Sequence, residues 1–375
     1  MLIDNVQVLM NDGAFRRGAV EFDDTIQRVE VYGAAAAGAG PYLIPGLIDL
    51  HTHGVRGHAH SDASVEKMRE MAVFYAKNGV TSFLATTLTA PEDELASAMS
   101  NVAQYERQPD GARCAGINME GPFFSYEKRG AQPADMLKLP DISMFERLFA
   151  ISGERIKLVC LAPELDGAME FIREASKVCR VSLAHSTADY KTAMQAFGNG
   201  ATHVTHLFNG MNSFLHREPG IVGAALDANA FVEVICDGHH LHPTIVRAIY
   251  KMFPGRACMI SDSLRCTGLP DGIYESGGLP VLLRNGKAML LDGSSLAGST
   301  ITLMQGVRIA VSIGIPLAQA ISAASIHNAQ AIGMEGRIGS IVPGACADLV
   351  LLDSELGVQK VYIDGKEISN SRTLH

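Results

Sequence analysis

Residues 43–53 read LIPGLIDLHTH, an apolar run that ends in His51-Thr52-His53. A short apolar run next to a turn signal is typical of a buried strand. His51 and His53 are two residues apart, so on a strand their side chains point to the same side and can bind one metal ion. The stretch therefore predicts a buried strand that ends in a pair of metal ligands.

Seven more apolar runs follow, and helix-period segments lie between most of them. The eight runs are residues 43–50, 80–87, 114–120, 156–162, 181–185, 202–208, 231–237 and 257–262. Repeated strand-then-helix units predict an α/β fold, either a closed parallel barrel or a wide doubly wound sheet. The count of eight favours a TIM-like (β/α)8 barrel. Residues 263–298 interrupt the rhythm with a hairpin signal at Asn285-Gly286, and two helices are expected near 299–313 and 316–331.

The two ends of the chain differ from its middle. Residues 1–44 contain short extended runs with turn signals, and residues 340–375 have the same character, with a hairpin signal at Asp364-Gly365. We expect both ends to form one small β-sandwich domain. Residues 45–339 are then expected to form the barrel, as a metal-dependent catalytic domain.

Composition narrows the class of protein. Apolar residues make up 47% of the 375 residues and charged residues 19%, which excludes a disordered chain. The 31 basic residues are outnumbered by 40 acidic ones and form no block, so we expect no nucleic-acid partner. No apolar run approaches the ~20 residues of a membrane span, so we expect no membrane partner. Seven scattered cysteines without a CxxC pair favour a cytoplasmic protein with reduced thiols.

Polar side chains recur at the ends of the predicted strands, where the chemistry of such barrels lies. Beside the first histidine pair, these ends carry Glu120, His185, His206 and Asp262. Each alone has a plainer explanation, such as a hydrogen-bonded structural histidine, but their convergence predicts a metal site. A nitrogen and oxygen donor set without thiolate suits one or two divalent ions, zinc in the first place, with iron, cobalt or manganese as alternatives.

Asp262 ends the eighth run. A carboxylate beside a water that a metal activates can take its proton and return it to a leaving group, which predicts metal-assisted hydrolysis. The alternative is that Asp262 caps a helix. His203 lies three residues before His206, so it faces the opposite way, and we expect it to pack against a helix. The seventh run ends in Asp237 and His240 follows it, but Asp237 could instead be a turn former.

Residues 45–54 closely resemble the first-strand signature of the amidohydrolase superfamily. Within it, the chain is similar to the family of N-acetylglucosamine-6-phosphate deacetylases over nearly its whole length. The motifs that carry this resemblance keep the family's order: MEGPF (119–123), KRGAQP (128–133), LAPE (161–164), AHS (184–186), THLFNGM (205–211), HREPG (216–220), DGHHLHP (237–243), ISD (260–262) and LAGST (296–300).

The resemblance implies roles for individual residues in the hydrolysis of N-acetylglucosamine 6-phosphate to glucosamine 6-phosphate and acetate. It assigns the main metal site to Glu120, His185 and His206, a second ion to His51 and His53, and the catalytic acid/base to Asp262. Arg217 matches the residue that binds the sugar phosphate, in some relatives from a neighbouring subunit, which implies a homodimer. The remaining matches to substrate contacts are Ala131, Gln132, Asn209, Gly210, Asp237, His240, Leu296, Ala297 and Gly298.

Three rival functions stay open at this point. The first is deacetylation of another N-acetyl hexosamine, such as N-acetylgalactosamine 6-phosphate. The second is a dipeptidase or N-acyl amino acid deacylase of the same superfamily, and the third is a non-catalytic barrel that serves as a binding module. The sequence departs from the family at Asn118-Met119, where His-Leu is common, at Gln132, which is His in some members, and at Gly210, where Ala is common. These departures bear on substrate preference more than on reaction type.

Overall fold

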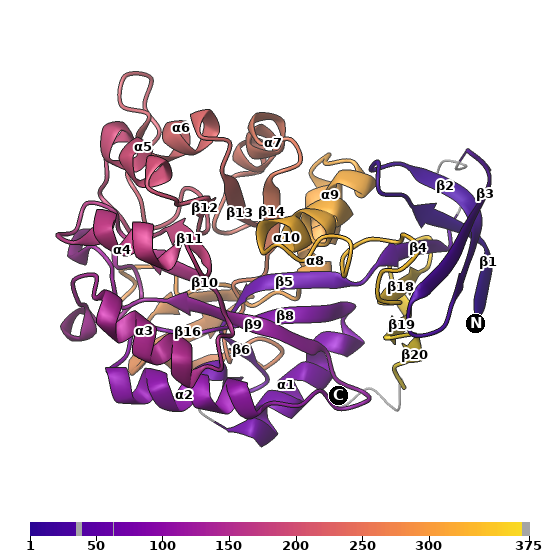
Figure 1. The fold of residues 1–375 in the computed structure, drawn as a ribbon, viewed down its shortest axis with the longest axis horizontal. Coiled ribbons are helices and arrows are strands. Elements are labelled where there is room, and N and C mark those ends of the chain that lie inside the picture. Colours follow the sequence, from indigo (N-terminus) through magenta and orange to yellow (C-terminus); the bar gives the residue numbers. More distant parts are fainter. Residues whose placement is uncertain (35–39, 63, 370–375) are drawn as a thin grey trace.

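The computed structural model describes residues 1–34, 40–62 and 64–369, and its core is a barrel of eight parallel strands (Figure 1). The strands neighbour one another in chain order: β5 (Leu47–Thr52), β8 (Val80–Thr86), β9 (Arg113–Glu120), β10 (Ile156–Leu161), β11 (Arg180–Leu183), β12 (His203–Val204), β13 (Phe231–Ile235) and β14 (Ala257–Ile260). Just beyond β14, the backbone N–H of Asp262 donates to the His51 carbonyl at 2.8 Å and so links the last strand to the first. The predicted barrel is confirmed.

Helices connect the strands and surround the barrel (Figure 1). N-cap side chains stabilise the first turn of several helices. The Ser64 side chain accepts a hydrogen bond from the Lys67 backbone N–H at the start of α1, and the Asp189 side chain accepts one from the Thr192 backbone N–H at the start of α5. Among the described residues, no helix has the length and apolar character needed to cross a bilayer. The seven connecting helices are α1 (Val65–Lys77), α2 (Glu92–Gln104), α3 (Ile142–Ile151), α4 (Ala168–Ala175), α5 (Tyr190–Gly198), α6 (Gly220–Asp227) and α7 (Pro243–Met252).

Short elements occupy the loops near the mouth of the barrel. They are the two-stranded pair β6 (Gly54–Val55) and β7 (His58–Ala59) and three 3-10 turns at His60–Asp62, Tyr126–Lys128 and Ala134–Met136. These turns lie in the two loops that follow β5 and β9, on the same side of the barrel as the predicted site.

The predicted insertion is a three-stranded antiparallel sheet. It consists of β15 (Gly272–Ser276), β16 (Leu279–Arg284) and β17 (Lys287–Leu290), with Asn285 and Gly286 both at positive φ in the expected hairpin turn. Three helices follow: α8 (Leu303–Ser312), α9 (Leu317–Ala323) and α10 (Ile326–Ala331). The prediction of one helix over 316–331 was wrong, because the backbone leaves the helical conformation at Ser325 (φ −143°, ψ −79°).

The chain ends form a separate seven-stranded sheet beside the barrel (Figure 1). In spatial order it contains β20 (Lys366–Glu367), β19 (Val358–Ile363), β18 (Leu349–Leu352), β4 (Tyr42–Pro45), β1 (Leu2–Leu9), β2 (Phe15–Phe22) and β3 (Ile26–Ala34). The rings of Phe22 and Tyr362 lie 5.3 Å apart although three strands separate β2 from β19. The sheet therefore curls until its two halves enclose a common core. Residues 35–39 and 370–375 of the predicted terminal domain lie outside the described residues.

The first predicted strand, 43–50, is in fact two strands in different sheets. β4 ends at Pro45 in the terminal sheet, and β5 begins at Leu47 in the barrel. A side chain on the intervening Gly46 would overlap the side chain of Thr81, so glycine permits this close approach of β5 and β8. The domain limits at residues 45 and 340 stay a prediction.

Candidate active site

Three of the predicted site residues lie two positions beyond the ends of barrel strands. His185 follows β11, His206 follows β12 and Asp262 follows β14. All three have a left-handed backbone, with φ of 47°, 28° and 50°, which is uncommon for residues other than glycine. Such strained conformations cluster at functional sites, where the surrounding structure holds them. Glu120 is the last residue of β9, so it enters the same mouth of the barrel.

The first cluster consists of Glu120, His185 and His206, all buried. Oε1 of Glu120 lies 3.2 Å from Nε2 of His206 and 3.4 Å from Nε2 of His185. The two Nε2 atoms are 3.2 Å apart. Two imidazole nitrogens and a carboxylate oxygen therefore converge on one point, as ligands of a divalent ion do.

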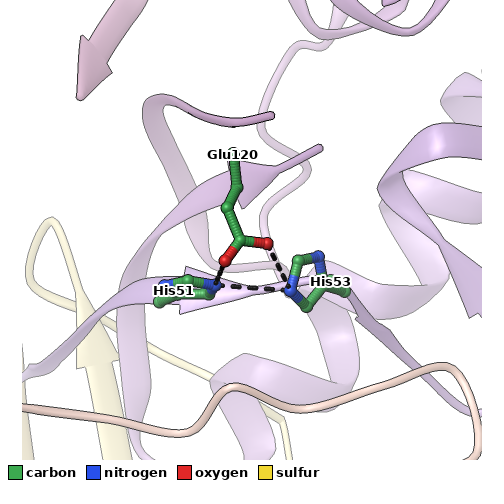
Figure 2. A group of neighbouring side chains, drawn as sticks. All are labelled: His51, His53 and Glu120. Atoms are coloured by element: carbon green, nitrogen blue, oxygen red, sulfur yellow. Dashed lines mark hydrogen bonds and ion pairs between the residues drawn. The ribbon is translucent and has the colours of Figure 1, made fainter. Parts of the chain in front are cut away.

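The second cluster consists of His51, His53 and the same Glu120 (Figure 2). Figure 2 shows both rings directed at the carboxylate. The two Nε2 atoms are 3.3 Å apart. Oε2 of Glu120 lies 3.3 Å from Nε2 of His53, and Oε1 lies 3.5 Å from Nε2 of His51. Glu120 thus belongs to both clusters, and the side chains of His51 and His53 lie close together, on one side of the chain.

In the first cluster, the Nδ1 atoms of His185 and His206 face away from Glu120, and their hydrogen bonds indicate that Nε2 is the candidate ligand atom. Nδ1 of His185 donates to the Lys128 carbonyl at 2.8 Å, and Nδ1 of His206 donates to the Asn209 carbonyl at 3.2 Å. A carbonyl only accepts, so each Nδ1 carries the hydrogen and each Nε2 keeps its lone pair. Metal-binding histidines are typically oriented in this way. Within each cluster the candidate ligand atoms all lie within 4.8 Å of one another, so the donor set fits a metal ion.

Electrostatics favour the charged forms of Glu120 and His51. Burial raises the pKa of Glu120, but the nearby His51, His185 and His206 outweigh burial and bring this pKa well below its usual value. Burial lowers the pKa of His51, but the carboxylates of Glu120 and Glu233 outweigh burial and raise it well above its usual value. The pocket therefore attracts positive charge strongly.

Asp262 lies on the side of the second cluster that faces the cavity. Its Oδ1 is 3.3 Å from Nε2 of His53 and 3.6 Å from Nε2 of His51. Burial raises the pKa of Asp262, but these two histidines outweigh burial and lower the pKa below its usual value. The carboxylate is therefore ionised at neutral pH and able to accept a proton.

A cavity of about 220 Å³ opens above the two clusters. The insertion supplies one of its walls. The residues that line it are His53, Leu88, Glu120, Gly130, Ala131, Gln132, His185, His206, Asn209, Gly210, His240, Asp262, Leu264, Ser276, Ser295, Leu296, Ala297 and Gly298.

Two of the departures from the family pattern have structural counterparts here. The amide of Gln132 donates to Oε2 of Glu120 at 2.9 Å and accepts the Thr89 N–H at 2.8 Å, so Gln132 orients the carboxylate of Glu120. Gly210 has a φ of 60°, and a Cβ there would lie 2.9 Å from Nδ1 of His185. Glycine at 210 leaves room for this position of the His185 ring.

Two predicted substrate contacts are not part of the cavity wall. Asp237 is buried behind His240: its Oδ2 accepts from Nδ1 of His240 at 2.7 Å, and its Oδ1 accepts the backbone N–H groups of His239 and His240. Asp237 is thus a turn former that also fixes His240. Arg217 is exposed on the loop before α6 and does not line the cavity of its own chain.

Comparison with known proteins identifies the family to which this chain belongs. The model of the amidohydrolase family matches residues 42–368, which is most of the chain. This chain belongs to the amidohydrolase family. Family membership and the two histidine–glutamate clusters together indicate a divalent-metal site.

Curated members of the family match this amidohydrolase over most of their length. It is 36% identical over 364 residues to the N-acetylglucosamine-6-phosphate deacetylase of Vibrio furnissii, covering 94% of this chain and 91% of that protein. It is 38% identical over 328 residues to the N-acetylgalactosamine-6-phosphate deacetylase of Escherichia coli O157:H7, covering 86% and 87%.

Solved structures resemble this amidohydrolase along the whole chain. The N-acetyl-D-glucosamine-6-phosphate deacetylase of Mycobacterium smegmatis, solved as a mutant in complex with N-acetyl-D-glucosamine-6-phosphate, matches with a TM-score of 0.90 and 31% identity, covering 98% of this chain and 99% of that one. The N-acetylglucosamine-6-phosphate deacetylase of Thermotoga maritima gives a TM-score of 0.90 and 30% identity, covering 99% and 100%.

Sequence reasoning missed a buried acid that contacts the second cluster of this amidohydrolase. Glu233 lies in β13, where its Oε2 is 2.9 Å from Nδ1 of His51 and its Oε1 is 3.3 Å from Nε2 of His203. His203 also stacks on Phe231. We had expected His203 to pack against a helix, but the contacts found for it are with strand β13. A lone glutamate inside the apolar run FVEVI was the available signal.

Proposed function

We propose that this amidohydrolase removes the acetyl group of N-acetylglucosamine 6-phosphate, giving glucosamine 6-phosphate and acetate. The observation that carries the proposal is the position of Glu120, shared by two histidine pairs, with the ionised Asp262 beside them at the cavity. The curated relatives with this name support the choice of substrate.

The metal ligands in this proposal are His51, His53, Glu120, His185 and His206, holding one or two divalent ions. Nitrogen and oxygen donors without thiolate favour zinc, with iron, cobalt and manganese as alternatives. When bound, such an ion polarises the acetamido carbonyl and makes a water more acidic.

Asp262 takes the proton in the first half of the reaction. Water adds to the acetyl carbon, Oδ1 of Asp262 accepts the proton that the water loses, and the same carboxyl then delivers it to the departing amine nitrogen as the C–N bond breaks. The pKa of Asp262, lowered by His53 and His51 against the effect of burial, leaves it ready for the first step. His240, held by Asp237, donates a hydrogen bond to the acetamido oxygen.

The sugar occupies the cavity in this proposal. Arg217 binds the phosphate, because a guanidinium offers the bidentate fork that a phosphate needs. The other sugar contacts are assigned to Ala131, Gln132, Asn209, Gly210, Leu296, Ala297 and Gly298, all of which line the cavity.

Arg217 serves the site of a neighbouring copy, in a homodimer. Arg217 is exposed and does not line the cavity of its own chain, which supports this arrangement, as do Phe214 and Leu215, which are 45% and 49% exposed on the same loop. Apolar side chains exposed together mark a contact surface. The seven free cysteines support a cytoplasmic location.

N-acetylgalactosamine 6-phosphate is the second candidate substrate. The E. coli O157:H7 deacetylase with that specificity is 38% identical to this chain. The two sugars differ in the direction of one hydroxyl group, so the same catalytic residues would act on both.

The test is a deacetylation assay on both N-acetyl hexosamine 6-phosphates and their unphosphorylated forms, with metal content measured on the same sample. We expect the highest kcat/KM for N-acetylglucosamine 6-phosphate and a large loss without the phosphate. A higher kcat/KM for the galactose epimer would establish the second candidate. No acetate release from either sugar phosphate by the metal-loaded protein would refute both.

A further inference from the structure

Glu233 is a fully buried carboxylate that the proposed reaction does not use. It lies in β13, outside both metal clusters and outside the cavity lining. A buried carboxylate is costly unless other groups compensate its charge, so its partners indicate its role. Those partners are His51, His203 and the backbone of His206.

One oxygen of Glu233 contacts a residue from each cluster. Oε2 accepts from Nδ1 of His51 at 2.9 Å and from the backbone N–H of His206 at 3.1 Å. His51 belongs to the second cluster and His206 to the first. A single buried atom therefore ties the position of one candidate ligand to the backbone of another.

The contact also selects the tautomer of His51. Because Oε2 accepts, Nδ1 of His51 carries a hydrogen, and Nε2 faces Glu120 and Asp262. When a metal ion takes the place of the proton on Nε2, this contact leaves Nε2 as the ligand atom. His53 has no comparable support, since its Nδ1 has no hydrogen-bond partner among the described residues. Within the second cluster, Glu233 is thus the outer partner that fixes a histidine ring.

We propose that Glu233 is the positioning residue of the second metal site: it holds His51 in the ligating tautomer and in register with the first cluster. The inference rests on the proposed metal-dependent function and deepens it. It predicts that binding of a second ion depends on Glu233, whereas binding of the first ion depends on it much less. Loss of such an outer partner typically weakens metal binding by about 10–100-fold.

Four variants test this. Glu233→Ala removes the acceptor, and Glu233→Asp keeps the charge but withdraws the oxygen from His51. Glu233→Gln keeps an oxygen acceptor at the same distance. Asp348→Asn is the matched control, because Asp348 is also a buried carboxylate but pairs with Arg113, away from both clusters. Each purified protein is titrated with Mn²⁺, and bound ions per chain are counted by elemental analysis, with electron paramagnetic resonance to detect coupled ion pairs.

We expect two ions and a coupled signal in the unmodified protein, in Asp348→Asn and, with less than tenfold weaker second-ion binding, in Glu233→Gln. Glu233→Ala should hold one ion, and Glu233→Asp should bind the second about tenfold more weakly or worse. If Glu233→Ala does not fold, Glu233→Asp decides.

Unchanged second-ion affinity in Glu233→Asp would overturn the inference. Equal weakening of both ions, or a single ion in the unmodified protein, would also overturn it and leave the proposed hydrolysis standing. No bound ion in the unmodified protein would refute the proposed metal-dependent function itself.

Discussion

Nε2 of His51 lies 3.3 Å from Nε2 of His53, and both atoms face the carboxylate of Glu120. Two nitrogen lone pairs this close repel each other unless a cation or a proton lies between them. A divalent ion therefore stabilises the folded chain as well as supplying chemistry. Removing it should lower the stability of the protein.

The first prediction concerns this metal-linked stability. An ion present at about 1,000 times its dissociation constant stabilises the folded state by about 4 kcal/mol. We expect a higher melting temperature after adding Zn²⁺ or Mn²⁺ to chelator-treated protein, measured by calorimetry. The double variant His51→Ala/His53→Ala should show a smaller increase. Identical melting curves with and without metal in the unmodified protein would contradict the prediction.

The second prediction separates proton transfer from metal binding at Asp262. Asp262→Asn keeps the size of the side chain and tolerates the left-handed backbone, but it cannot accept a proton. We expect kcat to fall by about 10²–10⁴-fold, the usual contribution of an acid/base group, with metal content unchanged. Loss of metal in this variant would show that Asp262 is chiefly a ligand.

The third prediction tests whether Arg217 acts in a neighbouring chain. Asp262→Asn and Arg217→Ala proteins are unfolded, mixed and refolded together, and activity is assayed at low concentrations of the sugar phosphate. If Arg217 serves the partner, mixed dimers contain one intact site and activity returns. If it serves its own chain, every site keeps one defect and the mixture stays as inactive as the separate variants.

The fourth prediction concerns pH. Burial lowers the pKa of His240, but Asp237 outweighs burial and raises it above its usual value, so protonated His240 persists to higher pH. In Asp237→Asn this pKa should fall, and the basic limb of the kcat/KM profile should move to lower pH. An unchanged basic limb would remove His240 from the reaction.

The raised pKa of His240 also predicts how the stability of the folded protein changes with pH. Because the folded-state pKa of His240 is raised, its stabilising contribution is complete below the unfolded pKa of about 6.5 and is lost as pH rises through the folded value. Unfolding measurements on Asp237→Asn should show a weaker decline over that range. A decline as steep as that of the unmodified protein would contradict this sign.

Residues at strand ends could be predicted from the sequence because strand length and barrel topology together fix where a strand ends. His185 and His206 follow from that rule alone. The boundary between the two sheets could not be predicted, since Gly46 interrupts an apolar run that reads as one strand. Glycine is needed at position 46 because Thr81 approaches it closely, and Thr81 lies 35 residues further along the chain.

The roles of Glu233 and Arg217 could not be predicted from the residues around them in the sequence. The partner of Glu233, His51, is 182 residues away, and nothing local marks a buried acid as the support of a distant ring. In the proposed homodimer, Arg217 binds the sugar phosphate of a neighbouring chain, so its role rests on the resemblance and on the mixing experiment.

The left-handed backbone at His185, His206 and Asp262 also restricts how this protein can be redesigned. A change of the preferred ion at the proposed metal site would involve the ligands His185 and His206 or the adjacent Asp262, yet β-branched residues such as Thr and Val fit that conformation poorly. Productive libraries at the three positions should therefore be drawn from Asn, Asp, His and Gly. Selection for a new ion would then have to act mainly through His51, His53 and Glu120, whose backbone is ordinary extended strand or its continuation.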